Sequence, residues 1–495
     1  MLEADVDIQI TFYRETNTRR PETLRRGSGA RKADLGRLLR KSQARVNPPL
    51  TCHHVAIRAQ GTHAEGRYSH SSVSGSTDVT LRSRVAQGVF PHRFAFGVSL
   101  VCLATMDESS VFLWLCARRK TSKMGVVHLM SSIARIKQQK HSIITQHAKA
   151  DNWKGLTQVL TTFVPLSALW WVAEQTADVS YWLTAGMILL MSLFLVRVFV
   201  LMHDCGHGSL FRTAELNKSF GFAFGVVAGV SQHVWSRHHA YHHATNGNWA
   251  KYRGPLAIVT VDEYEALTPK QRRSYERARS TWLAPIAGFL YLIFNPRVTL
   301  LKGTVSLVAH IIQGKIAQPG ISIKAHAAAF ATPYWATAKE YWNMLCSNVA
   351  WLGGCVLMCC AIEPALFFTV YLISVSLAGG AGIALFTVQH NFEHAYASGD
   401  EGWDRDTAAI RGSSFLILPR WLNWFTANIA HHHIHHLSSR IPNYCLAKCH
   451  KEYEHLFTGV TRVNLSQVPK ALKCILWDTR RDRIISIAEH QRQTG

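Results

Sequence analysis

From residue 156 onward, long apolar segments alternate with polar ones along the chain. Segments 156–173 and 179–202 are each long enough to cross about 30 Å of hydrocarbon as a helix. Segments 348–362 and 365–388 follow later, and only Glu363 and Pro364 separate them, which predicts a helical hairpin. The pattern is typical of a multi-pass membrane protein.

Two shorter apolar segments, 220–230 and 282–294, are expected to lie in the membrane interface or to re-enter the membrane. Trp170, Trp171 and Trp182 are either interface anchors or walls of a substrate tunnel, and their positions fit both interpretations. We therefore predict an all-α, multi-pass membrane helical bundle with about four spanning helices plus interfacial helices.

Residues 1–123 follow a different pattern, being basic, rich in Gly and Pro near the start, and rich in Ser and Thr later. Such a composition cannot bury a core. We expect a disordered extension, or sequence that precedes the true start at Met124 or Met130. The alternative is a basic arm for lipid headgroups or nucleic acid. The membrane domain is predicted to be residues 124–495.

Composition narrows the class of protein further. A formal net charge of +23, from 54 Lys+Arg against 31 Asp+Glu, suggests nucleic acid or an anionic membrane surface as a neighbour. The apolar segments favour the membrane, and no nucleic-acid partner is expected. The 11 cysteines show no paired CxxC spacing, and Cys355, Cys359 and Cys360 lie in an apolar run, which argues against a zinc or disulfide framework.

The polar loops indicate how the chain is oriented. Segment 235–280 is rich in Lys and Arg, and so is the tail after Arg420, which places both on the cytoplasmic side by the positive-inside tendency. Two predicted spans lie between them, so the chain returns to the same side. We expect a cytoplasmic cap made of these two regions.

Of the 27 histidines, 11 stand in three motifs that emerge at this inferred cytoplasmic face. The first, "HDCGHGS", carries two histidines four residues apart, which places both on one helical face. The second, "WSRHHAYHHATNGN", and the third, "NIAHHHIHHLSSRIPNY", each contain an HxxHH pattern. The eight candidate ligands are His203, His207, His239, His242, His243, His432, His435 and His436.

Eight imidazoles converging at a membrane border indicate metal binding. Imidazole suits Fe, Zn, Cu and Ni, and one tetrahedral zinc needs only four ligands, so this many nitrogens predict two metals with coordination positions left for oxygen. A metal transporter, store or sensor is the alternative from a different class. The predicted spans are nearly free of charge, with Arg197 and Glu363 at boundaries, which argues against an ion path.

At these residues the chain resembles the membrane fatty acid desaturase superfamily, whose members hold a non-haem di-iron centre with three histidine boxes. The phrases "HDCGHGSLF", "HHATNGNWAKYRGPLAIVTVDEY", "VQHNFEHAY" and "IHHLSSRIPNY" are most similar to bacterial acyl-lipid desaturases. The likeness covers roughly residues 145 to 460, and the motifs are specific only in combination.

The resemblance implies one further ligand, His390 of "VQHNFEH", which gives nine in all. His394 and His431 depart from the usual pattern, and we do not assign them as ligands. Ligand imidazoles are held through their second nitrogens. The polar residues near the boxes that we expect to serve as such partners, or else as ordinary caps and loop residues, are Asp204, Asn246, Glu393 and Asn443.

The resemblance implies an O2-dependent desaturase that inserts a cis double bond into an acyl chain of a membrane lipid, with two iron ions and O2 as co-substrate. Soluble di-iron bundles use paired Glu-x-x-His motifs, and the spans contain no such pair. Without a haem module or a C-x4-C-x2-C motif, the electrons must come from a separate, ferredoxin-like donor. A hydroxylase or ketolase of the same superfamily is the nearest alternative. We expect a bacterial inner membrane location with the active site facing the cytoplasm.

Overall fold

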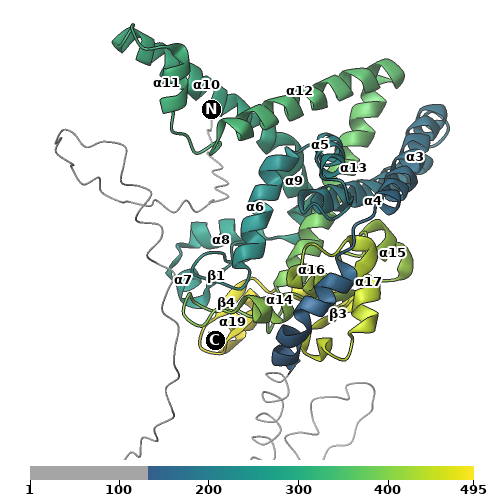
Figure 1. Ribbon diagram of the computed structural model, residues 1–495, viewed down its shortest axis with the longest axis vertical. Helices are drawn as coiled ribbons and strands as arrows, with labels where there is room; N and C mark the ends of the chain where they lie inside the picture. Colours follow the sequence, from purple (N-terminus) through teal and green to yellow (C-terminus); the bar gives the residue numbers. More distant parts are fainter. Residues whose placement is uncertain (1–131, 495) are drawn as a thin grey trace, which may run out of the picture. The chain divides into compact units, whose positions relative to one another are not determined.

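The computed structural model describes residues 132–494, so the expectation for residues 1–123 lies outside the described part of the chain. The described residues form a bundle of long helices above a cap of short helices and strands (Figure 1). The bundle consists of α3 (Asn152–Thr176), α4 (Tyr181–Gly206), α5 (Ala214–Ala228), α6 (Gln232–Thr245), α9 (Ala284–Phe289), the π-helical turn η3 (Leu290–Phe294), α10 (Asn295–Ala317), α11 (Ile323–Ala329), α12 (Ala338–Ala361) and α13 (Pro364–His390). The predicted all-α membrane bundle is confirmed.

Five described stretches of helix are long and apolar enough to cross a membrane. Four of them, α3, α4, α12 and α13, correspond to the predicted spans, with ends that differ by a few residues or by up to ten. The fifth is Thr281–Ala317, where the sequence suggested only a short apolar segment. The helix continues there because η3 joins α9 to α10, and α10 carries a second set of apolar residues beyond the polar Asn295–Arg297.

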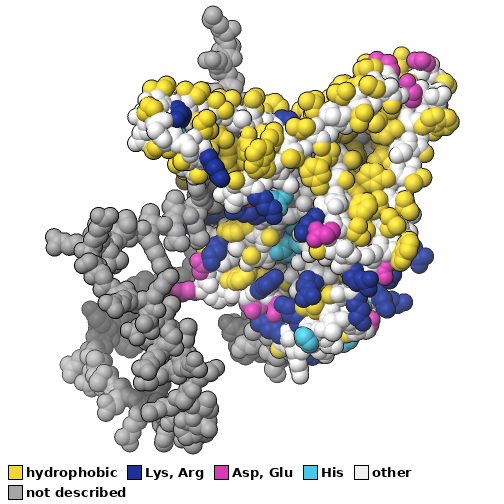
Figure 2. Space-filling view, turned by 45° about the horizontal axis from the view of Figure 1, so that its top comes forward, with side chains coloured by type: hydrophobic (Ala, Val, Ile, Leu, Met, Phe, Trp, Pro, Cys, Tyr) yellow, Lys and Arg dark blue, Asp and Glu magenta, His cyan; other side chains and the backbone are white. Residues whose placement is uncertain are grey.

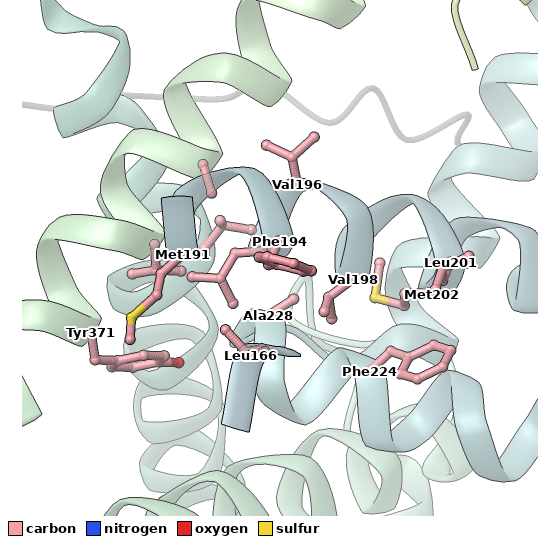
Figure 3. Close-up of a cluster of buried hydrophobic side chains, with 14 of the residues drawn as sticks. Leu166, Met191, Phe194, Val196, Val198, Leu201, Met202, Phe224, Ala228 and Tyr371 are labelled. Carbon is pink, nitrogen blue, oxygen red and sulfur yellow. The ribbon is translucent and has the colours of Figure 1, made fainter. Parts of the chain in front are cut away.

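The core of the bundle is built around α4 (Figure 3). Val198, Leu201 and Met202 of this helix are fully buried, and Phe224 of α5 packs against them. Glycines allow a second close contact, between α9 and α13. A Cβ atom added to Gly288 would lie 2.6 Å from the backbone of Gly379, so only small residues permit this approach.

Arg197 lies deep in α4, only 3% exposed, where the sequence suggested a helix-end position. Its Nε donates to the Thr162 hydroxyl at 2.9 Å, and its Nη2 donates to Gln158 Oε1 at 3.2 Å. Nη1 donates to the Trp424 carbonyl, and the guanidinium lies 4.0 Å from the Trp424 ring centroid. Arg197 therefore fastens α15 (Arg420–Phe425), which precedes the third histidine motif, to α3 and α4.

An apolar cavity of about 220 Å³ lies between α3, α4, α5, α12 and α13. Trp170 lines it, together with Met191, Leu195 and Tyr371. Trp171 and Trp182 are instead 66% and 88% exposed, on the outside of the bundle. The sequence did not show which of the three tryptophans are interface anchors and which line a tunnel. In the structure one of them lines the cavity, and the other two face outward, as interface anchors do.

The cap joins segments that are far apart in sequence. Strand β1 (Val259–Thr260) pairs in parallel with β4 (Leu476–Asp478), which pairs antiparallel with β5 (Arg483–Ile485), and β2 (Phe415–Ile417) pairs in parallel with β3 (Arg462–Asn464). The short helices of the cap are α7 (Val261–Ala266), α8 (Pro269–Ala278), α14 (Arg405–Arg411), α16 (His432–Leu437), α17 (Asn443–Glu452), η4 (Phe457–Gly459), η5 (Leu465–Gln467), α18 (Val468–Ala471) and α19 (Ile487–Thr494). The turn η2 (Thr281–Leu283) begins the fifth apolar stretch.

A helix over residues 132–147 completes the cap, with Ile136 and Ile143 buried in one cluster with Ile434 of the third motif. Figure 2 shows hydrophobic side chains over the upper part of the molecule and Lys and Arg mainly below them. This division is that of a membrane protein with a polar cap.

Candidate metal centre

The three histidine motifs meet where the bundle joins the cap. The first lies at the end of α4, the second on α6, the third on α16, and His390 is the last residue of α13. Their side chains form two groups, within each of which the ligand atoms lie within 4.8 Å of one another. The first group contains His203, His207, His239, His243 and His435, and the second contains His242, His390, His432 and His436.

The HxxHH motifs are divided between the two groups by helical geometry. His239 and His243 are four residues apart, so they share a helical face and one group, whereas His242 belongs to the other. The third motif repeats this rule with the groups exchanged: His432 and His436 lie together, and His435 lies in the first group. Each of the two HxxHH motifs therefore contributes histidines to both groups.

The Nε2 atoms of neighbouring rings face one another at short distances. His243 Nε2 lies 3.0 Å from His239 Nε2 and 2.9 Å from His435 Nε2. His432 Nε2 lies 2.9 Å from His390 Nε2 and 3.1 Å from His436 Nε2. Nitrogens that share a metal ion at about 2.1 Å are expected to lie roughly 3.0 to 3.4 Å apart, so these spacings fit common metal ions.

Hydrogen bonds on the outer nitrogens support this interpretation. His390 Nδ1 lies 2.9 Å from the Gly412 carbonyl, which can only accept, so Nδ1 carries the proton and Nε2 presents its lone pair. His203 Nδ1 lies 2.9 Å from the Asp204 carboxylate, which selects the same tautomer. Lone pairs that converge in a buried site require a cation, and the residues present therefore fit the two metals that the sequence suggested.

Burial keeps these imidazoles neutral, as metal ligands must be. The desolvation of His239, His242, His243 and the three ligands of α16 lowers their pKa values well below the usual 6.5, and the neighbouring histidines lower them further. His207 and His243 are the ligands of the first group that reach partly to the surface. Among the candidate ligands of this group, these two residues therefore lie nearest to the surface.

The four polar residues expected to hold the ligands take different positions. Asp204 contacts His203 through Oδ1, and its Oδ2 accepts a hydrogen bond from the backbone N–H of Asn443 at 3.0 Å. Asn443 thus acts through its backbone, at the start of α17. The Asn246 side chain donates to the Gly412 carbonyl at 3.4 Å, beside the bond from His390.

Glu393 lies apart from both groups. Among the described residues it forms ion pairs with Lys470 at 3.1 Å and Arg483 at 2.8 Å, so it ties the cap together instead of holding a ligand. His394 is exposed, and His431 lies beside the third motif with its Nδ1 3.2 Å from the Asn428 carbonyl. Neither belongs to a metal group within the described part of the chain.

A histidine pair that the sequence analysis did not single out supports α16 from behind. His433 is fully buried, and its Nε2 lies 3.1 Å from Nδ1 of His450 on α17. The only signal in the sequence was that His433 stands between ligands on a short helix, on the face opposite to them. Its partner is 17 residues away, and no spacing rule identified it.

This pair predicts acid sensitivity of the fold. Burial lowers the pKa values of His433 and His450, so on acidification below 6.5 the unfolded chain takes up protons that the folded chain does not. For each such histidine, the free energy of unfolding is expected to fall by up to about 1.4 kcal/mol for every pH unit of acidification below 6.5. We expect the melting temperature in detergent to fall from pH 7 to pH 5, and to fall less steeply for His450→Gln. An equal slope in both proteins would contradict this assignment.

A second prediction concerns Asp204. In Asp204→Asn the amide cannot accept both from His203 and from the N–H of Asn443 with the strength of a carboxylate, so His203 is held less firmly. We expect metal affinity to fall about 10- to 100-fold, measured by competition with a chelator. Glu393→Gln is the control, because Glu393 contacts neither group among the described residues, and an equal loss there would show that the effect is not local.

The fold and the site define a class: a helical membrane protein with two buried groups of histidines that could hold metal ions, at the boundary between its bundle and its cap. Within that class, a family model for fatty acid desaturases matches residues 180–463. The chain belongs to the fatty acid desaturase family.

Relatives support this assignment. The chain is 31% identical to a protein named fatty acid desaturase from Bacillus subtilis (strain 168), over 72% of this chain and 92% of the relative. It is 25% identical to the sn-1 oleoyl-lipid 12-desaturase of Picosynechococcus sp., over 60% and 78% of the two chains. It is 26% identical to the sn-1 acyl-lipid omega-3 desaturase (ferredoxin) of Synechocystis sp., over 54% and 65%. The predicted family is confirmed, and with it an oxidoreductase that desaturates fatty acids. The hydroxylase, ketolase and transporter alternatives are not favoured.

Proposed function

We propose that this protein is an acyl-lipid desaturase that introduces a cis double bond into an acyl chain of a membrane lipid at a centre of two iron ions. The observation that carries the proposal is the convergence of nine imidazoles in two groups at the membrane border. The names of the two cyanobacterial relatives, both acyl-lipid desaturases, support a lipid-linked substrate over a free acid.

The five histidines of the first group would hold one iron, and the four of the second group would hold the other. Iron with O2 supplies the oxidising power that breaks unactivated C–H bonds, which no side chain of the chain can do by acid–base chemistry. The protein's own residues hold and orient the ligands. Asp204 and the Gly412 carbonyl fix the orientation and tautomer of His203 and His390.

The electrons would come from a separate ferredoxin-like protein that docks on the cap. His243 is partly exposed, and the positive charge of the exposed Arg405 lies near enough to lower its pKa further. This surface offers a short route to the first group and a cation for an acidic donor. A ferredoxin is named for the Synechocystis relative, which supports this class of donor.

For orientation, we infer a bacterial inner membrane with the cap in the cytoplasm. The stretch Thr281–Ala317 begins beside the cap, where Arg279 donates to the Leu256 carbonyl at 2.6 Å. The chain returns to α6 at the start of α12, where Glu340 pairs with Arg237. The start of this stretch and the start of α12 therefore lie on the same side of the membrane as the histidines. This supports a segment between them that enters and leaves the membrane without a net crossing, and it agrees with the cytoplasmic side that the basic loops indicate.

The test is the fatty acid profile of a bacterial host that expresses the full chain with a ferredoxin and its reductase. Mass spectrometry would locate any new double bond, and His435→Ala would be the control. A new unsaturated product that the control lacks is the expected result. An unchanged profile, with iron bound and electrons supplied, would contradict acyl-lipid desaturation in that host, and a hydroxylated product would point to the other chemistry of the superfamily.

A further inference from the structure

An aromatic residue stands four positions before the first ligand histidine on each of three helices. Phe199 precedes His203 on α4, Trp235 precedes His239 on α6, and Phe386 precedes His390 on α13. Four residues make about one helical turn, so each ring lies on the same face as its ligand. Because α4 and α13 reach the metal groups from within the bundle, Phe199 and Phe386 lie on the membrane side of those groups.

Phe199 and Trp235 contact each other beside the first metal group. Trp235 stacks on His239 with ring centroids 4.6 Å apart, and it lies 5.7 Å from His203. The Phe199 ring meets Trp235 edge to face at 5.2 Å. These contacts cover the first metal group with an apolar surface that contains no ligand atom.

Phe386 covers the second group and reaches the first. Its ring centroid lies 5.0 Å from that of His242 and 5.2 Å from that of His390, both in the second group. It also lies 6.3 Å from His239 of the first group. Of the three rings, Phe386 is the one that has contacts with ligands of both groups.

The aromatic surface is also tied to the irregular turn of the fifth apolar stretch. Tyr291 belongs to the π-helical turn η3, and its hydroxyl interacts with the Trp235 side chain. Tyr291 is 38% exposed on the outside of the described bundle. Single π-helical turns are frequent at functional sites, and this one places a tyrosine at the edge of the aromatic surface.

We propose that Phe199, Trp235 and Phe386 form the surface along which the acyl chain lies beneath the metals, and that Phe386 determines which pair of methylenes is desaturated. This proposal rests on the proposed acyl-lipid desaturase function. Phenylalanine and tryptophan bring neither a metal ligand nor a proton to the site, so their effect on the reaction is steric. A pocket distinguishes chains that differ by one methylene by about 10- to 200-fold, and only a close wall achieves this.

The experiment measures double-bond position in host lipids for the full-length wild type, Phe386→Ala and Phe386→Leu, with iron content measured in parallel. We expect one main isomer from the wild type and at least about a tenfold rise in neighbouring isomers from Phe386→Ala. Phe386→Leu, which retains part of the wall, should lie between the two. Iron content should stay at the wild-type value in both variants.

Phe368→Ala is the matched control, because Phe368 lies on the same helix, is 39% exposed, and is more than four turns away from His390. It should leave the isomer ratio unchanged. An unchanged ratio in an active, iron-loaded Phe386→Ala protein would overturn the proposal. Loss of iron in both Phe386 variants would overturn it as well, because the ring would then serve metal binding. Absence of any unsaturated product from the wild type would instead reject the proposed function.

Discussion

His390→Ala is expected to abolish desaturation while leaving the protein folded. His390 was suggested by a resemblance, and its Nε2 lies 2.9 Å from His432 Nε2 in a buried group of four. Removing it leaves three nitrogens for that metal and breaks the bond from Nδ1 to Gly412. Activity should fall by more than about 100-fold, since loss of even an outer hydrogen-bond partner of a ligand costs about 10- to 100-fold.

The measurement combines product analysis with iron content per protein. Iron should fall from two ions towards one, because the first group keeps all five of its histidines. His394→Ala is the matched control, four residues further along, exposed, and outside both groups within the described part of the chain. If His390→Ala kept two irons and wild-type turnover, His390 would be a structural histidine at the end of a span.

Arg197→Met is expected to have the second largest effect, on stability and on activity together. The change removes hydrogen bonds to Thr162, Gln158 and the Trp424 carbonyl, of which the Thr162 hydroxyl is fully buried. Hydrogen bonds from a charged group are worth about 1.5 to 3 kcal/mol each, so we expect a loss of roughly 3 kcal/mol after partial relaxation. Because α15 leads into the third histidine motif, the metal groups should loosen as well.

A drop in melting temperature of roughly 5 °C in detergent would be the direct readout, with iron content as the second. Arg197→Lys should recover part of the loss, since an ammonium keeps the charge but reaches fewer partners. The control is Arg273→Met on α8, where the arginine is exposed. Equal melting temperatures for the Arg197→Met protein and the wild type would show that the buried guanidinium is not needed to hold α15.

Much of this site was readable from the sequence because it depends on local spacing. Helices long enough to span a membrane follow from apolar length, and histidines four residues apart must share a helical face. The eight motif histidines therefore follow from spacing alone, and the resemblance supplied His390. Asp204 was identified by its position next to a ligand, and its contact with His203 is equally local.

Other features depend on contacts between distant segments, which spacing does not encode. Glu393 looks as suitable as Asp204 in sequence, yet ion pairs with Lys470 and Arg483, 77 and 90 residues away, direct it into the cap. Arg197 looks like a helix-end charge until α3 and α15 surround it. Segment 282–294 was predicted to lie in the interface or to re-enter the membrane, whereas η3 joins it to α10 in one long helical stretch.

The sequence by itself determined the family, the helices that form the bundle and the identity of the imidazoles, because each rests on residue type and short-range period. Only the tertiary structure decided how nine histidines divide into groups of five and four, since each group draws on at least three separate segments. It also decided which aromatic rings contact the two groups of histidines. The physical reason is that a metal site of this kind is made by packing four helix ends against one another, and the free energy of that packing belongs to the whole bundle.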